Sequence, residues 1–94
     1  MADYRYHTLS PETGAMLRAA RKRRGLGLKK AGREVGCDYT YLHYLEYGKR
    51  APSVAMAAEL IRGLELNQDE AMTLLAESVD GAGRSKPSKR KAAA

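Results

Sequence analysis

The segment 39–47, Tyr-Thr-Tyr-Leu-His-Tyr-Leu-Glu-Tyr, holds the densest group of side chains in this sequence that could contact another molecule. It contains four of the six tyrosines of the chain. At helical spacing Leu42 and Leu45 turn inward, which leaves an outer face formed by Tyr39, Thr40, His43, Tyr44 and Tyr47. A tyrosine or threonine hydroxyl can hydrogen-bond to a base edge or a phosphate, and a ring or methyl group can pack on a thymine methyl. These residue types favour contact with nucleic acid, although tyrosine is also common in protein interfaces.

The distribution of charge favours the same class of partner. The 94 residues carry a net charge of +6, and the pI is about 9.7. Residues 1–50 have eleven bases against five acids, residues 51–80 have one base against six acids, and residues 81–94 have five bases and no acid. Two basic segments around an acidic one are typical of a protein that turns one face to a polyanion. Nucleic acid is the leading partner, and a basic charge that only keeps a small protein soluble is the alternative.

Length and composition exclude several other classes of protein. Ninety-four residues allow one domain, which is too small for a multidomain enzyme. No apolar run approaches the roughly 18 residues of a membrane span, and the first five residues lack the features of a secretory signal. Cys37 is the single cysteine, so it has no disulfide partner within the chain. We therefore expect a soluble cytoplasmic protein, associated with the nucleoid.

The sequence shows no pattern of catalytic or metal-binding residues. Cys37 and His43 lack metal-ligand spacing with other cysteines or histidines, and no nucleophile is accompanied by a base and an orienting group. We therefore expect no enzymatic activity, no metal and no cofactor. Cys37 precedes the positive end of the helix predicted at 39–47, which could lower the pKa of its thiol, but packing in the turn is the favoured interpretation.

Helical spacing from Ser10 to about Val79 predicts an all-α fold with five helices, and a short strand at 4–6 is the only other element that the pattern allows. The nine glycines are interpreted as marks of helix ends and of the C-terminal segment. The first helix follows the cap Ser10, with Pro11 in its first turn, and ends at Gly25; the second spans 28–35 and ends at Gly36; the third spans 39–47 between Asp38 and Gly48; the fourth follows Ser53; and the fifth follows Asn67, with Glu70 completing a capping box.

The fourth and fifth helices carry wide apolar faces. In the fifth, the stripe is wider than a single core contact requires, so part of it is predicted to meet a partner. The face of the fourth helix consists of Val54, Ala57, Ala58, Leu60, Ile61 and Leu64, and that of the fifth of Ala71, Met72, Leu74, Leu75, Ala76 and Val79. The predicted homodimer contact consists of Ala71, Leu75, Ser78 and Val79.

These patterns divide the chain into three parts. Residues 1–9 are predicted to form a flexible N-terminal arm, with packing of residues 2–9 against the first helix as the alternative, residues 10–80 the folded domain, and residues 81–94 a disordered basic tail. The bases of the tail are suited to follow DNA phosphates or a narrow minor groove. A tail that is only solvated is the alternative.

The stretch from Leu17 to Leu64 resembles the Cro and phage-repressor type of helix-turn-helix, also called the XRE family. The resemblance implies a compact five-helix, lambda-repressor-like DNA-binding domain whose helix-turn-helix consists of the second and third helices, with the third in the major groove of double-stranded DNA. The residues that carry it are Leu17 and Arg21, Gly25-Leu26, Val35-Gly36, Tyr41-Leu42, Leu45-Glu46, and Gly48-Lys49-Arg50 with Pro52-Ser53.

The resemblance also implies roles for individual side chains. Arg21 is expected to form a partly buried, structural ion pair with Glu46. The family commonly reads bases with glutamine, asparagine or arginine, and commonly has glutamine where this chain has Leu28, so readout here leans on van der Waals fit and DNA shape. Base contacts are expected from Tyr39, Thr40 and Tyr44, with His43 as a weaker candidate, and phosphate contacts from Lys29, Lys30, Lys49, Arg50, Arg23 and the hydroxyl of Tyr41.

Taken together, these features indicate a small transcriptional regulator, more often a repressor, that binds DNA as a homodimer without a cofactor. A single helix-turn-helix makes few base contacts, so two copies on a near-palindrome are expected. One alternative is an antitoxin or phage accessory factor of the same fold, which binds a different protein through its fifth helix. The other is a protein-interaction module whose tyrosine-rich helix meets RNA polymerase or another regulator.

Overall fold

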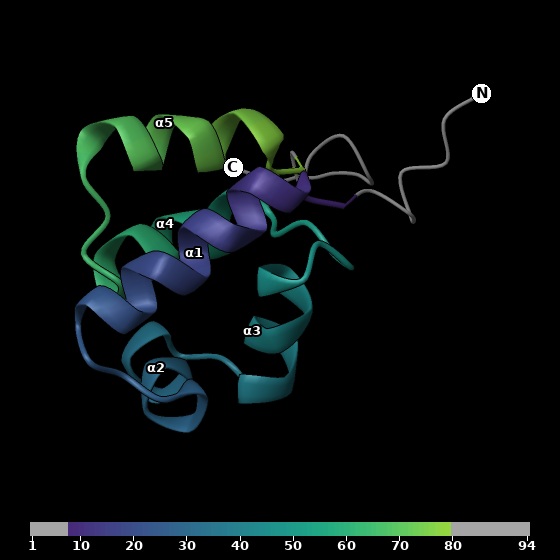
Figure 1. The fold of residues 1–94 in the computed structure, drawn as a ribbon. Helices are drawn as coiled ribbons and strands as arrows, with labels where there is room; N and C mark the ends of the chain where they lie inside the picture. The colour runs from purple at the N-terminus through teal and green to yellow at the C-terminus, as the bar shows by residue number, and fades with distance from the viewer. Residues whose placement is uncertain (1–7, 80–94) are drawn as a thin grey trace, which may run out of the picture.

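The computed structural model describes residues 8–79, and it consists of five helices (Figure 1). They are α1 (Pro11–Arg23), α2 (Leu28–Val35), α3 (Tyr39–Glu46), α4 (Val54–Gly63) and α5 (Gln68–Glu77). The prediction of an all-α fold with five helices is confirmed. Between residues 8 and 79 the only extended pairing is an isolated bridge between Ser53 and Val79. The predicted strand at 4–6, most of the predicted arm and the predicted tail lie outside the described residues.

Among the described helices, α1, α3, α4 and α5 begin where the capping residues predict. The Ser10 side chain accepts a hydrogen bond from the Thr13 amide at 3.1 Å, and Asp38 and Ser53 cap α3 and α4 in the same way. α5 begins with the predicted capping box of Asn67 and Glu70. The predicted ends differ slightly: α1 ends at Arg23, before Gly25, and α3 ends at Glu46, so that Tyr47 is its C-terminal cap.

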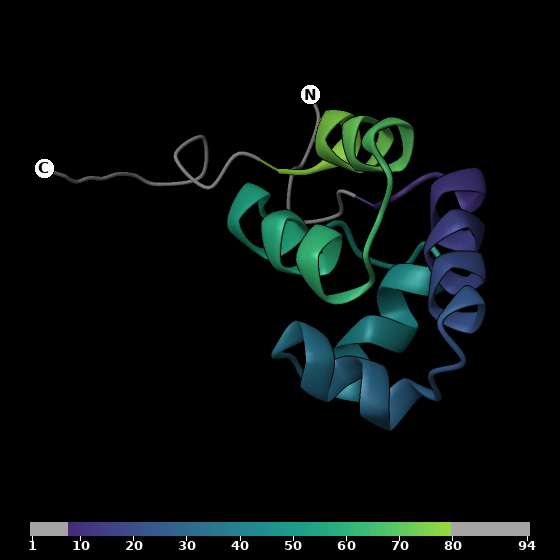
Figure 2. The same ribbon diagram turned by 90° about the vertical axis from the view of Figure 1, so that its left-hand side faces the viewer.

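Leucines from α1, α3, α5 and the segment around α4 meet in one core, and six of them have fully buried side chains. α1 packs against both α3 and α5. Figures 1 and 2 show from two directions that α2 and α3 form one end of the molecule and α5 the opposite end. The six buried leucines are Leu17, Leu42, Leu45, Leu60, Leu64 and Leu74.

The predicted apolar face of α4 is partly wrong. Ala57 and Leu60 are buried in this helix as predicted, but Val54 is 44% exposed and Ala58 is also exposed. α2 and α5 pack against α4, and they cover a narrower part of its surface than the predicted apolar face. The side that faces the core carries Ala57, Leu60 and Leu64, which follow one another at three- and four-residue spacing.

Two glycines inside helices allow close packing and do not mark helix ends as predicted. A Cβ on Gly14 of α1 would lie 2.5 Å from the carbonyl oxygen of Glu46 in α3. A Cβ on Gly32 of α2 would lie 2.8 Å from the carbonyl oxygen of Cys37 in the turn. Any larger residue would push these segments apart, so both glycines fix how closely the helices around α3 approach one another.

Two residues near the ends of the described range belong to the core. Leu9, which the sequence analysis assigns to a flexible arm, is 2% exposed, and its amide donates to the Arg50 carbonyl at 3.3 Å. Val79, which it assigns to a dimer contact, is 8% exposed and exchanges backbone hydrogen bonds with Pro52 and Val54. Leu9 is therefore part of the core, which fits the packing alternative for this segment, and Val79 is a buried residue rather than an exposed dimer contact.

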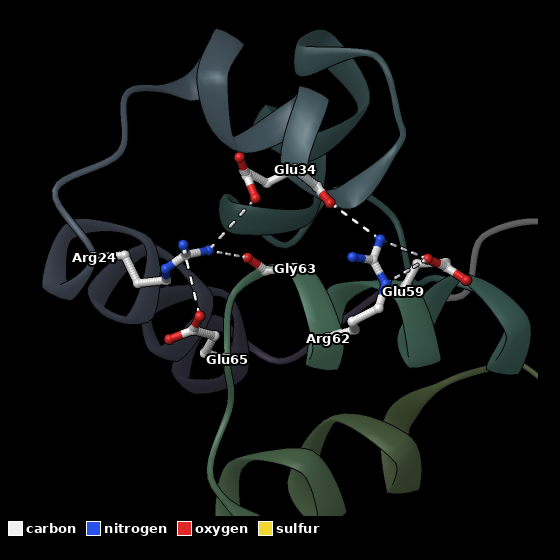
Figure 3. A network of polar contacts seen from close by, with 6 residues as sticks. All are labelled: Arg24, Glu34, Glu59, Arg62, Gly63 and Glu65. Carbon is white, nitrogen blue, oxygen red and sulfur yellow. Dashed lines mark hydrogen bonds and ion pairs between the residues drawn. The ribbon is translucent and has the colours of Figure 1, made fainter.

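Two arginines hold the C-terminal end of α2 against α4 (Figure 3). Arg24, just after α1, donates to the carbonyl of Gly63 and lies 4.0 Å from the carboxylate of Glu34 in α2. Arg62 of α4 donates to the main-chain oxygen of Glu34 at 3.1 Å. These contacts connect both sides of Glu34 to α4, and they position α2 relative to the rest of the fold.

Candidate nucleic-acid interface

A tight turn joins α2 to α3. Gly36 closes α2 with a left-handed backbone (φ 92°), and the amide of Cys37 donates to the Gly32 carbonyl at 2.9 Å. Asp38 then starts α3 by accepting a hydrogen bond from the Thr40 amide at 3.0 Å. The two helices meet through the close approach at Gly32, so their relative orientation is set by backbone contacts.

The inner side of α3 is buried. Leu42 and Leu45 are fully buried, and Glu46 is 3% exposed. The Nε of Arg21 donates to Glu46 at 2.6 Å and its Nη2 at 3.0 Å, while Nη1 donates to the Leu26 carbonyl at 2.9 Å. The hydrogen bond to Glu46 raises the pKa of Arg21 above its usual value, against the opposing effect of burial. The structure thus contains the ion pair that the resemblance implies, and the pair fastens α3 to α1.

The outer side of α3 carries exposed aromatic and hydroxyl side chains. Tyr39 and Tyr44 are 44% and 39% exposed, Thr40 is also exposed, and His43 is half-buried. The four residues predicted to contact bases therefore share the outer surface of one helix, although His43 is the least accessible of them.

Basic side chains lie around this surface. Lys29 of α2 has its Nζ 5.4 Å from the ring centroid of Tyr39, and Arg50 has its guanidinium carbon 5.7 Å from the ring centroid of Tyr41. Tyr44, Lys49 and Arg50 line an open hollow beside α3. Lys30 and Lys49 are exposed. Tyr41 is half-buried and packs against the core.

Arg23, predicted as a phosphate contact, faces elsewhere. Its Nη1 and Nη2 each donate to the Glu70 carboxylate of α5 at 2.9 Å. The sequence analysis could not identify this partner, because 47 residues separate the two side chains. An arginine that already binds a carboxylate with both nitrogens has its charge compensated, so we remove Arg23 from the candidate interface.

Arg18 of α1 is a candidate that the sequence analysis missed. Its guanidinium carbon lies 5.2 Å from the ring centroid of Tyr47, which is the residue that follows α3. Helical spacing places Arg18 one turn after Gly14, on the side of α1 that faces α3. This spacing identifies Arg18 only when the contact of Gly14 with Glu46 is known.

Cys37 lies in the turn but has no sign of activation. It is half-buried, and desolvation, with a smaller effect of the neighbouring Asp38 charge, raises the pKa of its thiol. The pKa of this thiol is thus raised and not lowered, which agrees with the favoured interpretation that Cys37 packs in the turn. Within residues 8–79, no group of three or more histidine, cysteine, aspartate or glutamate side chains could hold a metal ion.

This arrangement of helices can be compared with known proteins. A family model described as a helix-turn-helix domain matches residues 12–74, which is more than half of the chain. The chain belongs to the helix-turn-helix domain family. The match begins in the first turn of α1 and ends within α5. Neither a curated protein nor a solved structure matches the chain.

Membership of the helix-turn-helix family indicates a DNA-binding domain, since such domains typically place the second helix of the motif in the major groove. Members of such families typically carry no catalytic activity. In the range that the structure describes, no helix is both long enough and apolar enough to cross a membrane.

Proposed function

We propose that this protein is a sequence-specific double-stranded DNA-binding transcriptional regulator, acting as a repressor at the nucleoid in the cytoplasm. The observation that carries the proposal is the two-sided character of α3. Its inner side is fixed by Glu46 and two buried leucines, and its outer side presents Tyr39, Thr40 and Tyr44 among exposed lysine and arginine side chains. A helix with a fixed orientation and exposed hydrogen-bonding groups is suited to read base edges.

In this proposal the basic side chains around α3 bind the DNA backbone. Lys29, near the start of α2, lies beside Tyr39 at the N-terminal end of α3, and Lys30 is the next residue of α2. Lys49 and Arg50 follow the C-terminal end of α3. Phosphate contacts of this kind fix the position of a recognition helix in the groove but do not select a sequence. Selection then comes from Tyr39, Thr40 and Tyr44, with a smaller contribution from His43, and the hydroxyl of Tyr41 contacts phosphate.

The protein is proposed to bind a near-palindromic operator as a homodimer, with half-sites about one helical turn, roughly 34 Å, apart. α5 supports this idea, because Met72 is 61% exposed and Leu75 39% exposed at the end of the molecule opposite α2 and α3 (Figure 2). With Val79 buried, the proposed contact consists of Ala71, Met72 and Leu75, with Ser78 at its edge. Sedimentation of the free and DNA-bound protein tests the assignment, and a monomer in both states rules it out.

The same apolar residues favour a second candidate function, in which α5 binds a different protein. The protein would then be an antitoxin or phage accessory factor that still uses α3 on DNA. Co-purification of a stoichiometric product of a neighbouring gene, lost in the Met72→Ser/Leu75→Ser variant, would support this function. A homodimer with unchanged sedimentation in the presence of that product would exclude it.

Selection of duplexes from a random DNA library, at about 150 mM salt to suppress non-specific binding, tests the main proposal. The wild type should enrich a near-palindrome, and the Tyr39→Ala/Tyr44→Ala variant should lose this enrichment while it keeps salt-sensitive binding. Arg23→Gln, which lies outside both the proposed DNA contacts and the proposed dimer contact because Arg23 binds Glu70, is the control for recovery and folding. No enrichment by the wild type would reject sequence-specific binding and favour a protein-interaction module.

A further inference from the structure

Arg18 differs from the other arginines of its region in having no acidic partner among the residues that the structure describes. Arg21 binds Glu46, Arg23 binds Glu70, and the guanidinium of Arg24 lies 3.6 Å from the Glu65 carboxylate. Among residues 8–79, no carboxylate lies within ion-pair distance of Arg18. The positive charge of Arg18 is therefore uncompensated within the part of the fold that the structure describes.

The place of Arg18 in the fold brings this charge to α3. Gly14, one turn earlier in α1, makes the close contact with Glu46, and Arg21, almost one turn later, binds the same glutamate. Arg18 lies between these two contacts and reaches the ring of Tyr47 at 5.2 Å. Both of its neighbours are fixed to α3, so α1 holds Arg18 at a defined position on the flank of that helix.

The ring of Tyr47 is itself in contact with α3. The ring centroids of Tyr47 and His43 are 4.6 Å apart, with a tilt of 50° between the planes. A guanidinium that stacks on an aromatic face keeps its N–H groups at the edge of its plane, where they can still donate to an anion. Tyr47 therefore orients the guanidinium of Arg18 without neutralising it.

Other basic side chains lie on the flank of α3 that carries Tyr44. Successive residues of an α-helix are about 100° apart around its axis, so His43 and Tyr44 lie on different flanks. Tyr44 lines the hollow with Lys49 and Arg50, whereas His43 leads through Tyr47 to Arg18. A helix about as wide as the roughly 12 Å major groove has one phosphate backbone on each side.

We propose that Arg18 is a DNA-phosphate contact of α1, that Tyr47 is its positioning residue, and that it binds the backbone on the flank of α3 opposite Lys49 and Arg50. The proposal rests on the proposed function and adds to it the contact on the second backbone. It predicts a residue that raises the affinity for all duplexes equally, because phosphate contacts carry no direct sequence information.

The test compares Arg18→Gln with Arg23→Gln in binding to a fluorescently labelled mixed-sequence duplex. Both variants lose one positive charge from α1, but Arg23 faces α5. Loss of one phosphate contact should lower the slope of log K against log salt by about 0.9, so the ratio of wild-type to Arg18→Gln affinity should fall about 3.5-fold between 50 and 200 mM salt. Arg23→Gln should keep the wild-type slope. Equal slopes for wild type and Arg18→Gln, or equal reductions in the two variants, would overturn the proposal.

The role of Tyr47 is tested by substitutions with and without Arg18. Tyr47→Phe keeps the ring and should bind as the wild type does, whereas Tyr47→Leu should bind as weakly as Arg18→Gln. In the Arg18→Gln background, Tyr47→Leu should cause no further loss. An equal loss in both backgrounds would show that Tyr47 does not act through Arg18, and thermal melting of each variant identifies any loss of fold.

The wild type separates failure of this inference from failure of the proposed function. If it binds the duplex with a salt-dependent affinity and Arg18→Gln binds identically, DNA binding stands and the role of Arg18 is rejected. If the wild type does not bind the duplex even at 50 mM salt, both proposals are rejected, since non-specific binding should be strongest under that condition.

Discussion

One arginine–glutamate ion pair joins α1 to α3 and another joins α1 to α5. These two joints differ mainly in their exposure to water. The Arg21–Glu46 pair joins it to α3, with residues that are 8% and 3% exposed. The Arg23–Glu70 pair joins it to α5, and there the arginine side chain is 49% exposed. Each arginine donates two hydrogen bonds of 2.6–3.0 Å to its glutamate. Because the geometry is so similar, solvation must decide how strongly each joint resists rupture.

The difference in burial affects how firmly α1 fixes the orientation of α3. Opening the joint to α3 would leave a charge in the core, so α3 keeps one orientation relative to α1 and presents one set of side chains. Opening the joint to α5 exposes charges that water already reaches. We therefore expect α3 to be held more rigidly against α1 than α5 is.

The largest effect should come from breaking the buried joint. Arg21→Ala leaves the Glu46 carboxylate buried without its partner, and we expect the free energy of unfolding to fall by about 3–5 kcal/mol. Chemical denaturation followed by circular dichroism measures this change. Arg23→Ala is the matched variant, and its midpoint should stay close to that of the wild type. Equal midpoints for the two variants would remove burial as the deciding factor.

A second large effect should come from the close contact beside this joint. Gly14→Ala places a Cβ where the Glu46 carbonyl oxygen lies 2.5 Å away, so α1 and α3 must separate. The expected cost is about 1–3 kcal/mol, which is typical of overpacking, even though alanine is the better helix former. Thermal melting measures it, and a stabilised Gly14→Ala protein would mean that the α1–α3 contact can widen freely.

The local features of this fold were predictable from the sequence because short-range signals determine them. Ser10, Asp38, Ser53 and Asn67 each accept a hydrogen bond from an amide two or three residues away, and such caps can be read from residue type alone. The joint between Arg21 and Glu46 was predictable in a different way, through the resemblance to the helix-turn-helix family.

The remaining features depend on contacts that residue type and spacing do not encode. Arg23 follows two other charged residues in the sequence, and only the packing of α5 on α1 brings Glu70 to it. Gly14 was interpreted like the glycines at helix ends, because its role depends on a carbonyl 32 residues away. The approach of Arg18 to Tyr47 likewise appears only after α1 has packed on α3. In the candidate interface, the exposure of the tyrosines on the outer side of α3 could be predicted, but the basic side chains that flank them could not all be identified.

An intermediate effect should come from the second contact between α1 and α5. The Glu77 carboxylate accepts hydrogen bonds from the Ser10 amide at 2.7 Å and from the Thr13 hydroxyl at 2.6 Å. Burial acts to raise the pKa of Glu77, but these hydrogen bonds outweigh it and hold the pKa below the usual 4.5. Glu77→Ala should therefore cost about 1–2 kcal/mol at neutral pH.

The lowered pKa also fixes the pH dependence of this contribution. Since the pKa is lower in the folded state, the stabilisation is complete above the unfolded-state pKa near 4.5 and is lost as the pH falls through the folded-state pKa. Denaturation curves between pH 7 and about pH 2 should show a smaller acid-induced loss for Glu77→Gln than for the wild type. An identical loss in both proteins would exclude Glu77 as a source of acid sensitivity.

The smallest effect, and the sharpest test of the comparison, concerns Arg23→Gln. The hydrogen bond from Arg23, followed by that from the Asn67 amide, lowers the pKa of Glu70, so part of the lowering should persist in the variant through the capping box. Salt weakens exposed ion pairs much more than buried ones. The small difference in melting temperature between Arg23→Gln and wild type should therefore disappear in about 1 M salt, while the large difference between Arg21→Gln and wild type should persist. If salt removed both differences, water would reach the two joints equally, and the rigidity that we assign to α3 would have another cause.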